Sequence, residues 1–520
     1  MPIRSSVRTN IYKDSVALMR LAETVVERTG IKRATLLMGT SGNKDILAKA
    51  GMLDASVNDA KPSDIMIVIE DERSETLDAA LAEIKNLIEG KPAKPDENGD
   101  SNSLVKARAP RSLGMALAGG IDVNIAQISV PGLYAGAEAM KAVRGGLNVF
   151  LFSDNVPLEQ ERTLKRLAAQ KNLLVMGPDC GTAIIAGVPF GFANAVRRGP
   201  IGLVGASGTG LQAVSSRIHQ LGGGVSHAIG TGSRDVQKAI GGISILHGLK
   251  LLAADPTTRV IAIISKPPAT AVRDRILGQA EQAGKPIVAC FLEEMDGSRE
   301  SAIHAVGTLE EVALAAVALA AGDGAARRAP SPEVLPPPAR LMPSQLYLRG
   351  LYSGGTFCYE AQLVWRRLGI TALSNAPLDA KYKLEEGVES RGHCAIDLGS
   401  DEFTVGRPHP MIDYGARIER FKREAADPSV AAVVLDIVLG YGSHEDPAGA
   451  LAPAIRQVRE QVAKAGRDLA VICFICGTEE DPQRISVQQE KLRSAGAWLA
   501  ESSGGAAHAA ASILSHATVG

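Results

Sequence analysis

The sequence predicts an α/β protein built from several Rossmann-like or flavodoxin-like, doubly wound parallel sheets, and three observations support this class. Short runs rich in Val, Ile and Leu alternate with alanine-rich segments of helical pattern along the chain. The runs are continuously apolar, which is typical of parallel strands that helices cover on both faces. At 520 residues the chain is also too long for one core, so we expect roughly three or four domains.

Each predicted strand is a short apolar run that an alanine-rich helical pattern follows, as expected for crossover connections. In chain order the strands are Arg33–Met38, Ile65–Ile69, Val123–Ser129, Asn148–Ser153, Leu173–Met176, Ile201–Val204, Val260–Ser265, Ile287–Leu292, Ala431–Leu439 and Leu469–Ile475. Two stretches lack this alternation of strand and helix patterns. Residues 90–110 are polar and rich in Pro, Gly and Asn, which predicts a mobile loop. Residues 326–343 include Pro-Pro-Pro and are predicted to be a linker between domains.

Composition and charge exclude several function classes. The formal net charge is −1 with acidic and basic residues interspersed, so neither nucleic acid nor an anionic membrane is an expected partner. The six cysteines are scattered among apolar residues, which is typical of reduced thiols in a cytoplasmic protein without disulfides. No segment reaches the ~18 to 20 apolar residues that cross a bilayer, and the first ten residues lack a signal-peptide core. We therefore expect a cytoplasmic location.

The most informative segment is residues 205–210, Gly-Ala-Ser-Gly-Thr-Gly, between a short apolar strand and an amphipathic helix. At such a junction unpaired backbone N–H groups and two hydroxyls converge where the helix dipole is positive. We therefore predict that Ser207, Gly208 and Thr209 bind phosphate or another oxyanion. The alternative is a plain helix N-cap with a glycine required for packing.

A weaker version of this junction follows the linker. Residues 353–356 read Ser-Gly-Gly-Thr ahead of a helical run, which predicts phosphate binding by Ser353, Gly355 and Thr356. Two anion corners in one chain indicate chemistry on a phosphorylated or acyl-activated small molecule. No motif predicts a metal site, because the Cys-x-x-Cys at Cys473 and Cys476 lies on an apolar strand without a second ligand pair.

Several motifs resemble the succinyl-CoA synthetase superfamily. Residues 130–137, Val-Pro-Gly-Leu-Tyr-Ala-Gly-Ala, resemble a loop that helps the synthetase α subunit hold CoA. Residues 177–184, Gly-Pro-Asp-Cys-Gly-Thr-Ala-Ile, resemble its Gly-Pro-Asn-Cys-Pro-Gly segment, and residues 205–210 resemble the turn facing its phosphorylated histidine. After the linker, residues 353–360 and 397–400 resemble the carboxyl-terminal domain of the β subunit.

The resemblance implies a domain order. Residues 1–196 are expected to form an N-terminal CoA-binding-like Rossmann region, and residues 197–325 an α-subunit-like ligase domain. Residues 344–520 are expected to form a flavodoxin-like domain similar to the end of the β subunit, without an ATP-grasp region. The implied ligand-binding residues are Pro131, Gly132, Asp179 and Cys180, with CoA as a possible ligand.

The chain departs from the synthetase at the phosphoryl carrier. Where the α subunit has a glutamate in a Gly-Glu-Ile-Gly-Gly turn, this chain reads Ser-Lys-Pro-Pro at residues 265–268. His304, near the carrier position, lacks the flanking glycines of the Met-Gly-His-Ala-Gly loop and is expected on the approach to a helix. These departures argue against phosphohistidine chemistry by this chain alone.

Residues 405–413, Val-Gly-Arg-Pro-His-Pro-Met-Ile-Asp, resemble a hallmark of the FdrA branch of acyl-CoA synthetase-like proteins. An imidazole, a guanidinium and a carboxylate within seven residues would orient a small oxyanion and move a proton. We therefore predict catalytic roles for Arg407, His409 and Asp413. The alternative for His409 is an exposed loop position between two prolines.

The FdrA resemblance implies a subunit of oxamate carbamoyltransferase, which converts carbamoyl phosphate and oxamate to oxalurate and phosphate in allantoin catabolism. The expected ligands are carbamoyl phosphate and phosphate, and the expected assembly is a homodimer or a hetero-complex with other pathway subunits. One alternative is acyl-CoA ligation with a partner that supplies the ATP-grasp module. A second alternative is a scaffold without catalytic activity.

Overall fold

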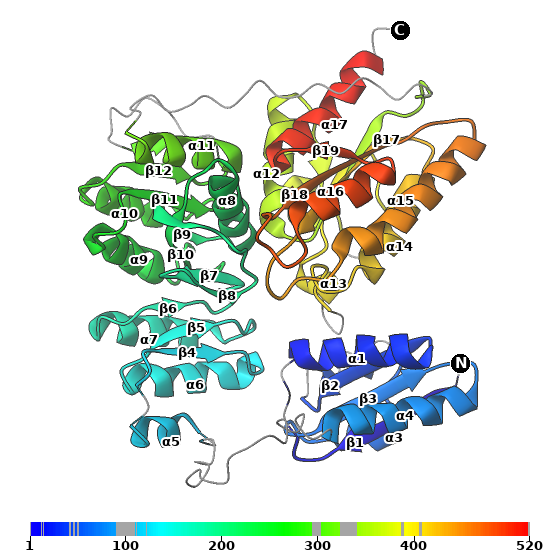
Figure 1. The fold of residues 1–520 in the computed structure, drawn as a ribbon, viewed down its shortest axis with the longest axis horizontal. Coiled ribbons are helices and arrows are strands. Elements are labelled where there is room, and N and C mark those ends of the chain that lie inside the picture. The colour runs from blue at the N-terminus through cyan, green and yellow to red at the C-terminus, as the bar shows by residue number, and fades with distance from the viewer. Residues whose placement is uncertain are drawn as a thin grey trace, which may run out of the picture. The chain divides into compact units, whose positions relative to one another are not determined.

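The computed structural model describes residues 2–11, 13, 15–40, 43–44, 47–48, 51–89, 110, 112–120, 122–293, 303–322, 341–385, 389–404 and 408–517. Residues 90–109 of the predicted loop and 326–340 of the predicted linker lie outside these ranges. The chain divides into two compact units, residues 1–121 with 404–408, and residues 122–403 with 409–520. Each unit is described by itself (Figure 1).

The first unit holds a three-stranded antiparallel sheet of order β1-β3-β2. Its elements are β1 (Ile3–Arg8), α1 (Ser15–Thr29), β2 (Arg33–Met38), α3 (Ala55–Asn58), β3 (Ile65–Glu70), α4 (Ser74–Glu89) and α5 (Leu113–Ala118). This antiparallel sheet differs from the Rossmann-like arrangement that the sequence predicts over residues 1–196. In the central strand β3, Ile67 faces a core with α1 and α4, while Val68 faces a second core on the other side. Because β3 is buried on both faces, its sequence is continuously apolar, which is the pattern expected of a parallel strand.

The second unit begins with a small parallel sheet of order β4-β5-β6. Its elements are β4 (Ile125–Ile128), α6 (Gly132–Arg144), β5 (Asn148–Leu151), α7 (Leu158–Gln170) and β6 (Val175–Met176). Phe150 and Met176 of this sheet belong to the same hydrophobic core as Val204 and Ile263 of the next sheet. The two sheets therefore share one core.

The next sheet has seven strands in the order β13-β12-β11-β9-β10-β7-β8. Its elements are β7 (Thr182–Ile185), β8 (Val188–Gly191), β9 (Arg198–Ala206), α8 (Gly208–Gln220), β10 (Val225–Gly230), α9 (Ile243–Ala254), β11 (Val260–Ser265), α10 (Thr270–Glu281), β12 (Ile287–Cys290), β13 (Ile303–Ala305) and α11 (Leu309–Ala320). Strands β9 to β13 are parallel, and the β7–β8 hairpin adds an antiparallel edge. The chain order reverses between β9 and β11, and ligands in doubly wound sheets bind at such a switch point.

The last sheet has six parallel strands in the order β15-β16-β14-β17-β18-β19. Its elements are β14 (Tyr347–Tyr352), α12 (Gly355–Arg367), β15 (Ala372–Leu373), η1 (Ala380–Tyr382), β16 (His393–Asp397), α13 (Asp401–Thr404), α14 (Gly415–Ala426), β17 (Val430–Val438), α15 (Pro447–Lys464), β18 (Ala470–Cys476), α16 (Ile485–Ser494), β19 (Trp498–Ala500) and α17 (Ser503–Ala517). The predicted α/β class with doubly wound parallel sheets is confirmed in this unit. Among the described residues, no helix combines the length and apolar character needed to span a membrane.

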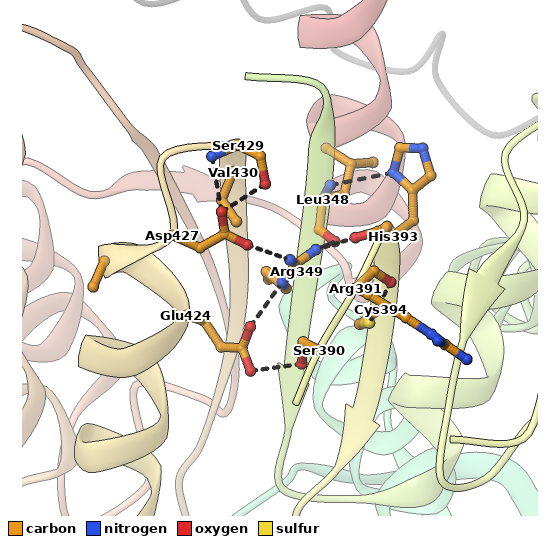
Figure 2. Close-up of polar contacts among 12 residues, drawn as sticks. Leu348, Arg349, Ser390, Arg391, His393, Cys394, Glu424, Asp427, Ser429 and Val430 are labelled. Atoms are coloured by element: carbon orange, nitrogen blue, oxygen red, sulfur yellow. Dashed lines mark hydrogen bonds and ion pairs between the residues drawn. The ribbon is translucent and has the colours of Figure 1, made fainter. Parts of the chain in front are cut away.

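A buried ion-pair network holds β14 against the end of α14 (Figure 2). Arg349 on β14 is fully buried, and its guanidinium lies 2.7 Å from Glu424 and 2.9 Å from Asp427. Ser390 donates a hydrogen bond of 2.7 Å to the other oxygen of Glu424. Because these contacts satisfy an otherwise costly buried charge, they fix the strand whose far end leads into α12.

Candidate functional site

The two predicted anion corners meet in the folded chain. Ser207 is the N-cap of α8, and its hydroxyl oxygen accepts a hydrogen bond of 3.1 Å from the backbone N–H of Gly210. The same hydroxyl lies 2.7 Å from the hydroxyl of Thr356 in the first turn of α12, and both groups are buried. A Cβ added to Gly354 would lie 2.5 Å from Cγ2 of Thr209. Helices α8 and α12 therefore begin in direct contact.

The start of α12 has no side-chain cap. Gly354 is its N-cap, with extended φ and ψ of −151° and 137°, so the first-turn N–H groups are not satisfied by a side chain. A Cβ added to Gly355 would lie 2.5 Å from Nζ of Lys266 and 2.6 Å from Oδ2 of Asp397. The ammonium group of Lys266, the carboxylate of Asp397 and the positive end of the α12 dipole thus share one small region. We call this region, with the adjoining start of α8, the helix mouth.

Ser353 is directed away from this mouth. Its backbone N–H donates a 2.8 Å hydrogen bond to Asp436, and its hydroxyl donates to the other carboxylate oxygen. Asp436 in turn forms a buried ion pair of 2.9 Å with Arg417. The structure thus engages both donors of Ser353, and the phosphate-binding role of this residue stays a prediction. The other predicted anion-binding residues lie together at the start of the two helices: Ser207, Gly208, Thr209, Gly355 and Thr356.

His409 is held as a neutral donor. Its Nδ1 accepts a hydrogen bond of 3.3 Å from the backbone N–H of Met411, which leaves the ring proton on Nε2. Burial, and next the charge of Arg417, lower the pKa of His409 to about 4. A Cβ added to Gly399 would lie 3.1 Å from His409 Nε2 and 3.2 Å from Oδ1 of Asp397. The ring is therefore uncharged at neutral pH and lies beside Asp397 with an N–H to donate.

Of the other two members of the predicted catalytic trio, the structure describes Asp413 alone. Arg407 lies outside the described residues. The carboxylate of Asp413 accepts a hydrogen bond of 2.7 Å from the backbone N–H of Gly415, which is a local turn at the start of α14. Catalytic roles for Arg407, His409 and Asp413 stay predictions.

Sequence reasoning did not select Lys266 and Asp397. Burial raises the pKa of Asp397, while Lys266 opposes this shift, so the carboxyl group holds its proton more readily than an exposed one. Lys266 follows β11 and Asp397 is the last residue of β16, so both lie at the carboxyl edges of their sheets. The available signal for Lys266 was its position in place of the synthetase glutamate, and for Asp397 the Asp-Leu-Gly-Ser motif.

The loop of residues 177–182 borders the start of α8. A Cβ added to Gly208 would lie 3.5 Å from Oγ1 of Thr182. Ser233 donates a hydrogen bond of 2.6 Å to the Asp179 carboxylate, which is exposed to solvent. Cys180 is buried, its thiol donates to the carbonyl of Thr182 at 3.4 Å, and burial raises its pKa to about 12. A thiol in this state is a poor nucleophile.

Pro131 and Gly132 begin helix α6. A Cβ added to Gly132 would lie 2.2 Å from the carbonyl oxygen of Asp154, so glycine permits close packing against the loop before α7. Their predicted ligand-binding role, like that of Asp179 and Cys180, stays a prediction. His304 lies within strand β13, whereas the sequence predicts it on the approach to a helix. Among the described residues, no group of three or more His, Cys, Asp and Glu side chains is arranged to hold a metal ion.

Comparison with known proteins identifies the family. The CoA-ligase family model matches residues 351–513, and the CoA-binding domain model matches residues 196–293. The chain is 42% identical over 513 residues to the uncharacterized protein YahF of Escherichia coli (strain K12), covering 97% of each chain. The chain belongs to the FdrA family of acyl-CoA synthetase-like proteins. The FdrA-family chain is also 25% identical over 150 residues to the ADP-forming sulfoacetate-CoA ligase subunit SauD of Bilophila wadsworthia (strain 3_1_6), covering 28% of this chain and 50% of that subunit.

Structural similarity to solved proteins is weak. The dinucleotide-forming acetyl-coenzyme A synthetase 1 of Ca. Korarchaeum cryptofilum is 16% identical to this FdrA-family chain, with a TM-score of 0.34. The likeness covers 81% of this chain and 88% of that one.

The N-terminal unit of this FdrA-family chain matches a different domain. Residues 1–104 match the AllF heavy metal-associated domain, which differs from the CoA-binding-like region expected over residues 1–196. These residues contain neither cysteine nor histidine, so they lack the thiolate and imidazole ligands that heavy metals prefer. Together the matches give a CoA-ligase and CoA-binding fold with an AllF-like domain, which supports an enzyme of acyl-CoA ligase-like type.

Proposed function

We propose that this chain binds an acyl phosphate at the helix mouth and transfers its acyl group, with carbamoyl phosphate as donor and oxamate as acceptor. The products are oxalurate and phosphate, which places the reaction in ureide catabolism. The observation that carries this proposal is the contact between the starts of α8 and α12, with Lys266 at the same point. Helix N-termini and an ammonium group are groups that bind phosphate in proteins.

The helix mouth supplies stabilisation where the reaction needs it. As the bond between carbonyl carbon and phosphate oxygen breaks, negative charge grows on the leaving phosphate. First-turn N–H groups of both helices and the Lys266 ammonium stabilise this charge without rearranging. The neutral His409 donates its Nε2–H toward the acyl oxygen.

Two features support direct transfer over a phosphoryl carrier. Lys266 replaces the glutamate of the synthetase turn, and a positive charge here attracts phosphate where a carboxylate repels it. His304, the residue nearest the carrier position, lies on the edge strand β13. Carbamoyl transfer needs a phosphate site and no phosphohistidine.

Phosphate release tests the proposal. The purified chain is incubated with carbamoyl phosphate and oxamate, alone and with the products of neighbouring genes, and oxalurate is identified by mass spectrometry. We expect equal amounts of phosphate and oxalurate, above the spontaneous breakdown of carbamoyl phosphate measured without oxamate. No oxalurate in any combination would refute the proposed reaction.

Acyl-CoA ligation is the second candidate, because the CoA-ligase and CoA-binding models match this chain and SauD is a ligase subunit. In this case a partner subunit supplies ATP-dependent activation, in a hetero-complex. Calorimetric titrations with CoA and with carbamoyl phosphate separate the two candidates. Tight CoA binding without carbamoyl phosphate binding would favour ligation.

A further inference from the structure

The proposed transfer requires a proton acceptor that the helix mouth does not supply. His409 is neutral and donates through Nε2, because Nδ1 already accepts a hydrogen bond from Met411. Lys266 is a donor, and Asp397 is buried, with Oδ1 accepting a hydrogen bond of 3.0 Å from the backbone N–H of Gly399 and Oδ2 lying with Lys266 at the start of α12. An acceptor nitrogen that attacks a carbonyl carbon must lose a proton, so a base is needed beside the acyl phosphate.

We propose that Asp179 is the general base of the acyl transfer and that the acceptor is therefore an amide or amine rather than a thiol. This inference rests on the proposed function and adds to it a base and a reason why the acceptor is not a thiol. Its geometric support is a carboxylate that is held by Ser233, open to solvent and carried by the loop that borders α8.

The backbone fixes this carboxylate in place. Asp179 has a φ of +57°, a left-handed conformation that residues other than glycine rarely adopt and that is enriched at functional sites. Its backbone N–H donates a 2.9 Å hydrogen bond to the carbonyl of Ser153, and the next N–H donates to Leu151. The Ser233 hydroxyl donates to Oδ2 at 2.6 Å and leaves Oδ1 to accept another proton.

Charged groups around Asp179 come from three other segments. Asp154 follows β5, Asp401 begins α13 and Lys266 follows β11. Crowding by protein atoms is the main cause that raises the pKa of Asp179 to about 6, and the charges of Asp154 and Asp401 add to it. The hydrogen bond from Ser233 and the charge of Lys266 act in the opposite direction. A carboxyl group with this pKa is ionised at neutral pH.

The same charges select the acceptor. Thiols attack as thiolates, which three neighbouring carboxylates repel. An amide or amine is neutral when it attacks, and its N–H groups donate to carboxylates.

The proposed step balances. The lone pair of the acceptor nitrogen forms a bond to the carbonyl carbon, and the bond from that carbon to the phosphate oxygen breaks with its electron pair on phosphate. The proton leaves the nitrogen for Oδ1 of Asp179 and then passes to the released phosphate, which departs as hydrogen phosphate. No oxidant, reductant or further reactant is required.

The pH dependence of kcat/KM in the active full-length protein or complex tests this assignment. We expect the wild type to rise with pH through a midpoint near 6, because the ionised carboxylate is the active form. The variant Asp179→Asn should lose this rise and about 10²- to 10⁴-fold in kcat. It should still bind inorganic phosphate at least as tightly as the wild type, because the substitution removes a negative charge near Lys266. Retention of both rate and pH profile in Asp179→Asn would overturn the assignment.

Two further variants separate a base from a structural residue. Ser233→Ala removes a donor that stabilises the charged form, so the midpoint should move to higher pH. Asp154→Asn removes a repelling charge, so the midpoint should move to lower pH. Shifts in opposite directions support Asp179 even if Asp179→Asn does not fold, and unchanged midpoints in both variants would refute it.

Acceptor competition tests the second half of the inference. With carbamoyl phosphate as donor, oxamate or hydroxylamine should give a carbamoylated nitrogen, whereas CoA should give no thioester. A thioester product would overturn the acceptor class while leaving acyl-phosphate binding intact. Absence of turnover in the wild type with every acceptor would instead be failure of the proposed function itself.

Discussion

Replacement of Lys266 by glutamine should weaken phosphate binding at the helix mouth. Nζ of Lys266 lies 2.5 Å from the position that a Cβ on Gly355 would take, so the ammonium is at the first turn of α12. An ion pair of unit charges at about 4 Å is worth about 4 kcal/mol at an effective dielectric of about 20. Because Lys266 is only half-buried, solvent screening lowers this figure to the range of about 1.5–3 kcal/mol found for charged hydrogen bonds.

This loss corresponds to an increase of about 10- to 100-fold in the Kd for phosphate. Isothermal titration with inorganic phosphate and with carbamoyl phosphate measures it, at low and at high salt. Lys381→Gln is the matched control, since its side chain is 63% exposed and pairs with Asp379 at 3.1 Å on the surface. Equal phosphate affinity of Lys266→Gln and wild type would refute a phosphate site at this mouth.

Three other outcomes are expected. Gly355→Ala should abolish phosphate binding with little loss of helix, because its methyl group would occupy the space between Lys266 and the Asp397 carboxylate. The control Gly278→Ala in α10, where an added Cβ meets nothing within 4 Å, should bind phosphate as the wild type does. Equal binding by both variants would contradict this prediction. Arg349→Met should lower the free energy of unfolding in urea by about 1–3 kcal/mol, because buried Glu424 loses one of its two arginine partners and Asp427 loses its arginine, and a change below about 0.5 kcal/mol would show that the network is dispensable. The native protein should react slowly with a disulfide reagent at pH 8 and release its full thiol count only after unfolding, since all six cysteines are buried; rapid labelling of a native thiol would show that its surroundings open.

Local structure at the site was predictable from the sequence because local residues determine it. The Ser-Gly-Thr-Gly segment encodes a helix start, and Ser207 caps α8 as expected. The apolar run at residues 260–265 encodes a buried strand, observed as β11. Ser353 shows the limit of such patterns, since its hydroxyl has the right sequence position but is taken by Asp436, a residue on another strand.

The sequence by itself determined the α/β class, both helix openings and the FdrA resemblance, because hydrophobic period, turn residues and motifs are properties of contiguous segments. Only the tertiary structure decided that the first unit is antiparallel, since a covered strand has the same apolar pattern in either direction. It also decided that Thr356 meets Ser207 and that Lys266 and Asp397 share the start of α12. Such contacts join residues far apart in the chain, and strand order, which no local pattern encodes, brings them together.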